Sequence, residues 1–340
     1  MNKKRYKRQL SCIVLLLLAA VAGIALTSAK SSRRVRDGEL KTSRYVYSGG
    51  VLGGKQHGYG VCRYKNGDVY YGHWNRGYKE GLGRLDFADG RMSFGVWKHG
   101  VLSPAKGARF KAGKRVYGID VAKYQKKIDW DKLSLRADAS GRVYAGRRKD
   151  KYLQPVLFAM VKSTEGATLQ DPNFKRNFRE AKSHGIIRGA YHFLSIQSDV
   201  DSQVRNFIDN TPLEIGDMPP VLDLEISKKT MERHHAKVCR MAREWLRKIE
   251  NYYGVKPIIY TYENYYKRYM KGHGFDGYDF WIARYSAEPS ARRWEIWQFT
   301  DRGRCTGINH DVDIDLFRGD YTALKNYVKT KGVRRTGSRR

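Results

Sequence analysis

The sequence predicts an α/β protein: a modified parallel (β/α) barrel of about eight strands, preceded by a small antiparallel array of β-hairpins. Three observations indicate this fold class. Residues 45 to 103 repeat at an offset of 23 positions, with glycines at regular places. About eight apolar, strand-like segments follow between residues 117 and 317, and helical patterns separate the earlier ones. The 340 residues are enough for two domains, and 41% of them are hydrophobic, which excludes a disordered chain.

Residues 1–29 have the pattern of an export signal. Basic residues come first, and an apolar run from Leu10 to Leu26 follows. The run is short for a membrane span, and no clear A-x-A cleavage site follows it. A cleaved signal peptide and an N-terminal membrane anchor therefore both remain open. Either one predicts that the rest of the chain is exported, to the periplasm or outside the cell.

The charge of the chain predicts an anionic partner. The formal net charge is +32, from 66 Lys and Arg against 34 Asp and Glu. Residues 1–29 carry five basic residues and no acid, so 61 basic residues remain against 34 acids without them, a charge of +27. An exported protein meets little nucleic acid, which leaves a cell-wall polymer or an anionic membrane surface.

The sequence offers no motif for a metal, a cofactor or a disulfide framework. Cys12 lies in the apolar run, which leaves Cys62, Cys239 and Cys305 as an odd and scattered set. No C-x-x-C or H-E-x-x-H spacing occurs. We therefore expect neither a metal nor a cofactor.

The repeated region resembles MORN repeats. GKQHGYGVCRYKNG (54–67) aligns with GYKEGLGRLDFADG (77–90), and the family pattern YxGxWxxGxxxGxGxxxxxxG is matched by Tyr71, Gly72, Trp74, Gly77, Gly81, Gly83 and Gly90. We expect these residues to be the framework of stacked hairpins and not a ligand site. MORN arrays are linked to membranes and scaffolding, so the resemblance implies an anionic membrane surface as a partner for residues 45–112. The basic tail, residues 326–340, has the same affinity.

From residue 115 the pattern changes to strands alternating with helices. The expected strands are YGIDVA (117–122), LFAMVKST (157–164), IRGAYHFL (187–194), PPVLDLEI (219–226), KPIIYTY (256–262), DFWIARY (279–285), WEIWQFT (294–300) and DVDIDLF (311–317). The helical stretches shrink toward the end, which suggests a barrel whose last strands are joined by loops. We assign residues 113–325 to this domain, residues 30–44 to a linker, and residues 326–340 to a disordered tail.

Four acids are expected to meet at the mouth of this barrel. Asp120, Asp223, Glu225 and Asp313 lie at or near the C-terminal ends of three expected strands, where such barrels gather functional groups. Asp223 and Glu225 are two positions apart on one strand, so their side chains share a face. A single acidic residue on a strand more often caps a helix or pairs with a basic residue than takes part in catalysis. Carboxylates held together away from water shift apart in pKa, so that one keeps its proton near neutral pH, as acid cleavage of a glycosidic bond requires.

From about residue 115 to residue 325 the chain resembles glycoside hydrolase family 25, the muramidases also called Chalaropsis-type lysozymes. The resemblance lies in successive segments in the family's order: YGIDVAKYQKKIDW, FAMVKSTEGATLQDPNFKRNFREAKSHGIIRGAYHFL, PPVLDLE, PIIYTY, FWIARY and WEIWQFTDRGRCTGINHDVDIDLF. It implies a modified (β/α) barrel that cleaves the β-1,4 bond between N-acetylmuramic acid and N-acetylglucosamine in peptidoglycan.

The resemblance also implies roles for the four acids. Glu225 matches the general acid that protonates the leaving oxygen. Asp223 would steady the 2-acetamido group of the substrate, or the cation that this group forms on attacking the anomeric carbon. Asp120 and Asp313 would shape the charge of the pocket. Such a mechanism is substrate-assisted and retaining.

Aromatic side chains near the mouth suit a sugar substrate, whose C–H faces pack on rings. The candidates for substrate binding are Tyr191, Tyr260, Trp281, Trp297 and Gln298. Ordinary core packing is the alternative for each ring, and we favour site lining only for Tyr191 and Trp297. Nearby, His192 is expected to be a core residue and Lys162 to pair with Glu165.

The sequence departs from the family at three places. Ser is usual where this chain has Ala122, and Asn where it has Asp315, and both changes are expected to lie outside the set of four acids. Residues 136–155 form an apparent basic insertion, which we expect to be a solvated loop in preference to a wall-gripping element.

The sequence therefore predicts an exported lysozyme that hydrolyses peptidoglycan. Two other functions stay open: a non-catalytic cell-wall-binding protein that keeps the fold, and a membrane-associated scaffold dominated by the MORN region. The four acids argue against the first, and the size of the barrel domain argues against the second.

Overall fold

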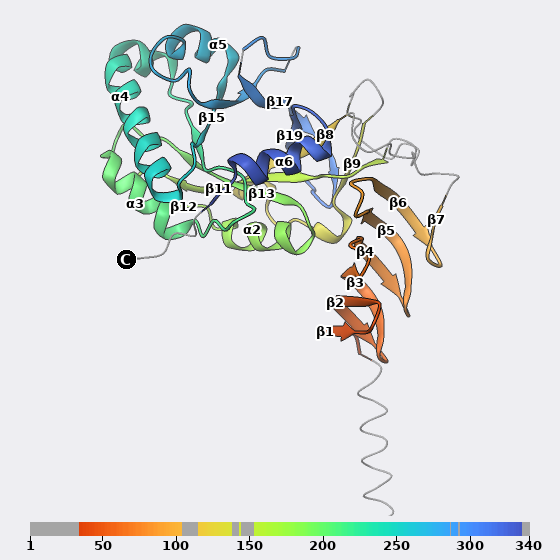
Figure 1. The fold of residues 1–340 in the computed structure, drawn as a ribbon. Coiled ribbons are helices and arrows are strands. Elements are labelled where there is room, and N and C mark those ends of the chain that lie inside the picture. Colours follow the sequence, from red (N-terminus) through yellow and green to blue (C-terminus); the bar gives the residue numbers. More distant parts are fainter. Residues whose placement is uncertain are drawn as a thin grey trace, which may run out of the picture.

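The computed structural model describes residues 34–103, 115–137, 143, 153–285, 287–291 and 293–334. The export segment expected at residues 1–29 lies outside this range, as do most of the insertion and the last six residues of the tail. Within the described range, no helix combines the length and the apolar character that crossing a membrane needs. Figure 1 shows a curved sheet of hairpins standing beside a barrel, with β1 farthest from the barrel.

Seven strands form the hairpin sheet, and each pairs antiparallel with the next one along the chain. They are β1 (Arg36–Lys41), β2 (Tyr45–Leu52), β3 (Lys55–Tyr64), β4 (Val69–Asn75), β5 (Tyr78–Asp86), β6 (Met92–Lys98) and β7 (Val101–Leu102). Short turns with glycine connect most of them, as the repeat pattern predicts.

Glycines recur in the middle of this sheet because aromatic rings lie over them. A Cβ atom at Gly60 would overlap the ring of Tyr47, and one at Gly83 would overlap the ring of Tyr70. The indole Nε1 of Trp97 donates to the carbonyl oxygen of Gly83 at 3.0 Å. The repeated glycines and aromatics therefore build the sheet itself, as we expected.

Two expected boundaries differ from the structure. Residues 36–41 fall in the expected linker 30–44 but form β1, which pairs with β2 along its whole length. Their side chains are mostly exposed, so no apolar alternation marks this edge strand in the sequence. At the other end, helix α6 (Tyr321–Lys331) continues into the expected tail 326–340, because Tyr327 and Val328 pack against the barrel.

The second sheet has nine strands, of which eight close into a barrel and β12 (Leu169–Gln170) extends one edge. In their order around the barrel the eight are β8 (Val116–Val121), β11 (Phe158–Glu165), β13 (Ile187–Phe193), β14 (Val221–Asp223), β15 (Ile258–Tyr262), β16 (Asp279–Ala283), β17 (Trp294–Gly303) and β19 (Val312–Phe317). From β8 through β17 the neighbours are parallel.

The expectation of an entirely parallel barrel is wrong for β19, which runs antiparallel to both β17 and β8. The segment between β17 and β19 is too short for a crossover helix, so the chain can only turn back. The beginning of β19 therefore lies at the same end of the barrel as the carboxyl ends of the other strands. This orientation matters for Asp313, the second residue of β19.

Helices cover the outside of the barrel and one of its ends. The longer ones are α2 (Phe174–Ser183), α3 (Val200–Asn210) and α4 (Lys228–Tyr253), and the apolar positions of α4 are buried as their spacing predicts. Leu324 and Tyr327 of α6 join the interior cluster next to Val116 and Phe317, so α6 closes the end opposite to Asp120.

Short elements complete the described chain. They are η1 (Lys123–Gln125), η2 (Trp130–Lys132), β9 (Ser134–Arg136), β10 (Leu153–Gln154), α5 (Glu263–Tyr265), η4 (Tyr266–Met270) and β18 (Cys305–Thr306). β9 pairs with both β10 and β18, so the two flanks of the insertion 136–155 belong to a small sheet and not to a loop. Backbone pairing fixes these flanks, which composition alone did not reveal.

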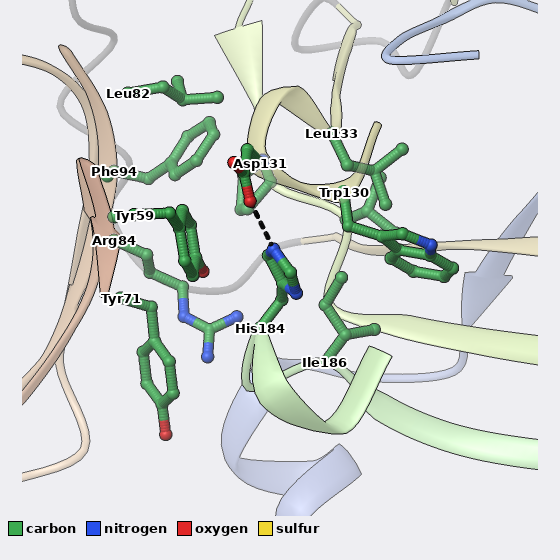
Figure 2. Close-up of a pocket in the computed structure, with 14 residues that line it drawn as sticks. Tyr59, Tyr71, Leu82, Arg84, Phe94, Trp130, Asp131, Leu133, His184 and Ile186 are labelled. Atoms are coloured by element: carbon green, nitrogen blue, oxygen red, sulfur yellow. Dashed lines mark hydrogen bonds and ion pairs between the residues drawn. The ribbon is translucent and has the colours of Figure 1, made fainter. Parts of the chain in front are cut away.

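The hairpin sheet is joined to the barrel through a buried arginine (Figure 2). Arg84 forms an ion pair with Asp86, with Nε and Oδ1 3.0 Å apart, and its Nη2 donates to the carbonyl oxygen of Gly185 at 2.8 Å. The hydroxyl of Tyr321 in α6 donates to the other oxygen of Asp86 at 3.3 Å. The ring of Tyr71 lies under the guanidinium, 4.6 Å away.

A second set of contacts lies beside this arginine. His184 Nε2 contacts Asp131 Oδ1 at 2.9 Å, and the ring of Tyr59 from β3 lies 4.2 Å from the His184 ring. His73 Nε2 contacts the carbonyl oxygen of Asp131 at 3.0 Å. The free space between these residues is about 40 Å³, so the joint is closely packed.

Candidate active site

The barrel brings all four predicted acids to one end. Asp120 lies near the end of β8, Asp223 is the last residue of β14, and Glu225 follows it by two positions. Asp313 comes close to Asp120 because the antiparallel β19 pairs these two residues directly. We expected Asp313 near the end of its strand, whereas it lies near the beginning of β19. The reversed direction of β19 returns it to the same mouth.

Asp223 and Glu225 form a carboxyl pair with little access to water. Asp223 is 6% exposed, and its Oδ1 has no hydrogen-bond partner among the described residues. Burial raises the pKa of Asp223 well above its ordinary value, and the nearby charge of Glu225 raises it further. Lys162 opposes this rise from a distance, while its ammonium pairs with Glu165 at 2.7 Å. This pairing is the one that we expected.

Glu225 is half-buried, and its pKa is raised above the ordinary value. Burial is the largest cause, and the charge of Asp313 adds to it. Hydrogen-bonding contact with Tyr260 and Tyr262 limits the rise. Because Asp223 and Glu225 lie close together and both resist ionisation, the pair holds a proton at a pH where isolated carboxyls would have lost theirs. Such a pair can supply a proton to a bound group.

A second group of carboxyls lies beside this pair and contains an acid that was not predicted. Asp120 and Asp313 are in hydrogen-bonding contact, and Asp315 contacts Asp120 in the same way. Burial raises the pKa of all three, to about 6 for Asp313. The charges of neighbouring acids add to the effect of burial, so this cluster also retains protons.

Asp315 was expected to lie outside the four acids and to leave them intact, and the structure adds that it contacts Asp120 directly. The side chain is completely buried, and its Oδ1 accepts a hydrogen bond from Trp281 Nε1 at 2.8 Å. The signal was present in the sequence: Asp313 and Asp315 are two positions apart on one strand and must share a face. The same argument had already identified Asp223 with Glu225.

Gln298 links the acid cluster to the tyrosines of the mouth. Its Oε1 accepts hydrogen bonds from the hydroxyls of Tyr260 at 2.9 Å and Tyr285 at 3.0 Å. The amide nitrogen must therefore point the other way, and it donates to Asp120 Oδ2 at 2.9 Å. Two tyrosines at the mouth are new candidates for substrate binding, Tyr285 and the nearby Tyr262. They are 45% and 42% exposed, and neither was singled out in the sequence.

The other predicted aromatics divide between the two faces of the strands. Tyr191, Tyr260 and Trp281 lie inside the barrel, with the rings of Tyr260 and Trp281 4.4 Å apart. Trp297 packs with Phe299 against the outer core, which contradicts the expectation that it lines the site. Adjacent strand residues point to opposite faces, so Gln298 inside requires Trp297 outside.

His192 is a core residue, as expected. It is completely buried between Thr164 Oγ1 at 2.8 Å and Gln203 Oε1 at 3.2 Å, and its ring stacks on Trp245. Burial lowers its pKa to about 4, which keeps the imidazole neutral. Within the part of the chain that the structure describes, no group of three or more His, Cys, Asp or Glu side chains is arranged to hold a metal ion.

Comparisons with known proteins agree with both parts of the chain. Residues 119–308 match the sequence model of glycosyl hydrolases family 25, and residues 47–69 and 70–90 match that of the MORN repeat. The uncharacterized protein YegX of Escherichia coli (strain K12) is 33% identical over 231 residues, 67% of this chain and 78% of that protein.

A protein described as a lysozyme and a solved structure are also similar to this chain. Lysozyme M1 of Streptomyces globisporus is 29% identical, over 62% of this chain and 70% of that protein. The solved structure of a family 25 glycosyl hydrolase from Bacillus anthracis superimposes with a TM-score of 0.52 at 30% identity and covers 62% of this chain and 93% of that one.

Proposed function

This chain belongs to glycosyl hydrolase family 25 and is a glycoside hydrolase with MORN repeats, and on that premise we propose that it is an exported muramidase. Its substrate is the β-1,4 bond between N-acetylmuramic acid and N-acetylglucosamine in peptidoglycan. Relatives described as lysozymes and as an N,O-diacetylmuramidase support this substrate. Export is supported by the pattern of residues 1–29, and the net charge of the chain suits an anionic wall.

The observation that carries the proposal is the buried carboxyl pair at the end of β14. In the bound complex the shared proton of the pair lies on Glu225, which donates it to the glycosidic oxygen as the bond from that oxygen to the anomeric carbon breaks. Asp223, then ionised, stabilises the positive charge that develops on the sugar. Its Oδ1, which is buried and has no hydrogen-bond partner among the described residues, is the acceptor that we assign to the N–H of the 2-acetamido group.

The reaction proceeds with retention and uses the substrate's own acetamido oxygen as nucleophile. That oxygen attacks the anomeric carbon and forms a cyclic cation, water then opens the cation, and Glu225 takes the proton of the water. Asp120, Asp313 and Gln298 set the shape and charge at the bottom of the site, while Tyr191 and Tyr260 line it.

The stereochemical course tests this proposal directly. Wild-type enzyme is incubated with purified peptidoglycan strands, and the new reducing ends are followed by proton NMR during the first minutes. We expect the β-anomer to form first and the α-anomer to grow only by mutarotation. The α-anomer forming first would mean inversion, and no release of soluble fragments would mean binding without catalysis.

Removing the acid at position 315 is expected to stabilise the protein in a pH-dependent way. The folded-state pKa of Asp315 lies well above its unfolded value, so its contribution to stability is present below about pH 4 and is lost as the pH rises through the folded-state pKa. Asn at this position can still accept from Trp281 and donate to Asp120. Thermal unfolding of Asp315→Asn should therefore show a midpoint about 2 to 5 °C above wild type at pH 8 and near wild type at pH 4.

The matched control is Asp209→Asn, which removes an exposed acid from α3 and should shift neither midpoint by more than about 1 °C. An equal gain for Asp315→Asn at both pH values would show that packing, and not titration, causes the change.

A further inference from the structure

Lys126 has a backbone conformation that normally requires glycine. Its φ is 52° and its ψ is −133°, the geometry of the first central residue of a type II′ turn. A Cβ atom makes this region costly, and the strain is retained only where surrounding contacts enforce it. Among the described residues, the other non-glycine residues with positive φ are Arg76 and His99, which occupy equivalent hairpin turns one repeat apart.

The loop around Lys126 is held on both sides, so the strain cannot relax. Gln125 is buried, and its Oε1 accepts from the backbone N–H of Ala122 at 2.9 Å while its Nε2 donates to the carbonyl oxygen of Asp311 at 3.0 Å. The N–H of Lys126 donates to the carbonyl oxygen of Lys123 at 3.1 Å. On the other side, Ile128 is completely buried.

These contacts place Lys126 at the mouth. The loop leaves the end of β8, which carries Asp120, and the Gln125 bridge reaches Asp311, two positions before Asp313. Lys126 therefore lies on a loop that is connected to the two strands that carry Asp120 and Asp313.

The loop presents positive charge without a partner of its own. Lys123, Lys126 and Lys127 are exposed, and none of them forms an ion pair with an acid of the described chain. Tyr124 between them is 68% exposed. A cation and an aromatic ring side by side at a glycan-binding mouth suit a sugar that carries a carboxylate.

We propose that Lys126 is a specificity-determining residue that binds a carboxylate of the peptide-bearing N-acetylmuramic acid unit at the mouth of the barrel. This inference rests on the proposed function and adds the feature of the substrate that the loop recognises. Glycine would suit the backbone better at Lys126, as it would at Arg76 and His99, but of these three residues only Lys126 lies on a loop at the mouth of the barrel. Its ammonium is carried on a flexible four-carbon stem, which suits contact with a substrate bound there.

The test replaces Lys126 with Gly in the full chain. Relief of strain should raise the thermal midpoint by about 2 to 5 °C. Loss of an exposed charge contact should raise KM for peptidoglycan about two- to fivefold, with kcat unchanged. Lys126→Arg should keep both the strain and the low KM. A KM for Lys126→Gly equal to that of wild type would overturn the proposal.

A chemically altered substrate identifies the group that Lys126 contacts. Peptidoglycan whose carboxyl groups have been coupled to methylamine with a carbodiimide carries no carboxylates on its peptides. The neutral substrate should weaken binding of wild type about two- to fivefold more than it weakens binding of Lys126→Gly, in which only the other basic residues still respond to the carboxylates. A continued difference between the two proteins on the neutral substrate would show that no carboxylate is involved.

Arg76→Gly is the matched control because it also replaces an exposed cation at positive φ by glycine, in the turn between β4 and β5. It should stabilise the protein without changing KM.

Pelleting with insoluble peptidoglycan separates failure of the proposed function from failure of the role of Lys126. If wild type does not hydrolyse the polymer, the proposed function fails while binding still tests Lys126; if it hydrolyses and Lys126→Gly binds normally, only this inference fails.

Discussion

Glu225→Gln is expected to reduce kcat on peptidoglycan by roughly 10²- to 10⁴-fold, with KM nearly unchanged. Gln has almost the shape of Glu and can still contact Tyr260 and Tyr262, but it cannot give a proton to the glycosidic oxygen. Initial rates of soluble fragment release measure the effect. Glu288→Gln, at an exposed position in the loop after β16, should behave as wild type.

The pH profile provides a second readout for the same variant. Burial and the charge of Asp313 raise the pKa of Glu225, so the acid form is present below that raised value and is lost as the pH increases through it. Wild-type kcat should therefore fall on the alkaline side, and the residual activity of Glu225→Gln should not show this fall. The same alkaline limb in both proteins would assign the proton to another group.

Arg84→Ala is expected to produce the largest loss of stability, about 3 to 5 kcal/mol. Its guanidinium is nearly inaccessible to water, and its removal leaves Asp86, whose side chain is 18% exposed, without a counter-charge at the joint. It also leaves the carbonyl oxygen of Gly185 without its donor. Thermal unfolding followed by circular dichroism should show a midpoint lower by about 6 to 20 °C.

Two further variants test whether this loss of stability comes from leaving Asp86 without its counter-charge. Arg91→Ala removes an exposed arginine paired with Asp89 and should cost less than about 0.5 kcal/mol. The double variant Arg84→Ala with Asp86→Ala should recover part of the loss, because no charge is then buried alone. A single Arg84→Ala variant as stable as wild type would show that the sheet and the barrel do not depend on this joint.

Short-range patterns in the sequence predicted the carboxyl pair well. The two-residue period of a strand sets Asp223 and Glu225 on one face, and the period of 23 defines the hairpin sheet with its glycines under aromatic rings. The same period would have added Asp315 to the acids and moved Trp297 to the outer face. The omission of Asp315 and the misplacement of Trp297 have one cause. Each residue was judged alone, although the alternation of faces along its strand already indicated where its side chain lies.

Other features could not be read from local pattern. The direction of β19 depends on the length of the return from β17, and Asp313 reaches the mouth only because that strand is reversed. β1 is an exposed edge strand with no apolar alternation, and the joint depends on Arg84 meeting Gly185, 101 positions along the chain. The conformation of Lys126 is likewise imposed by contacts of Gln125 with a distant loop.

The central claim is that the carboxyls at the barrel mouth cleave the glycan strand after N-acetylmuramic acid. Its most direct test is mass spectrometry of the soluble products released from purified peptidoglycan, after borohydride reduction of their new ends. We expect products that end in reduced N-acetylmuramic acid for wild type and almost none for Glu225→Gln. Products that end in reduced N-acetylglucosamine, or fragments cut only within the peptides, would contradict it.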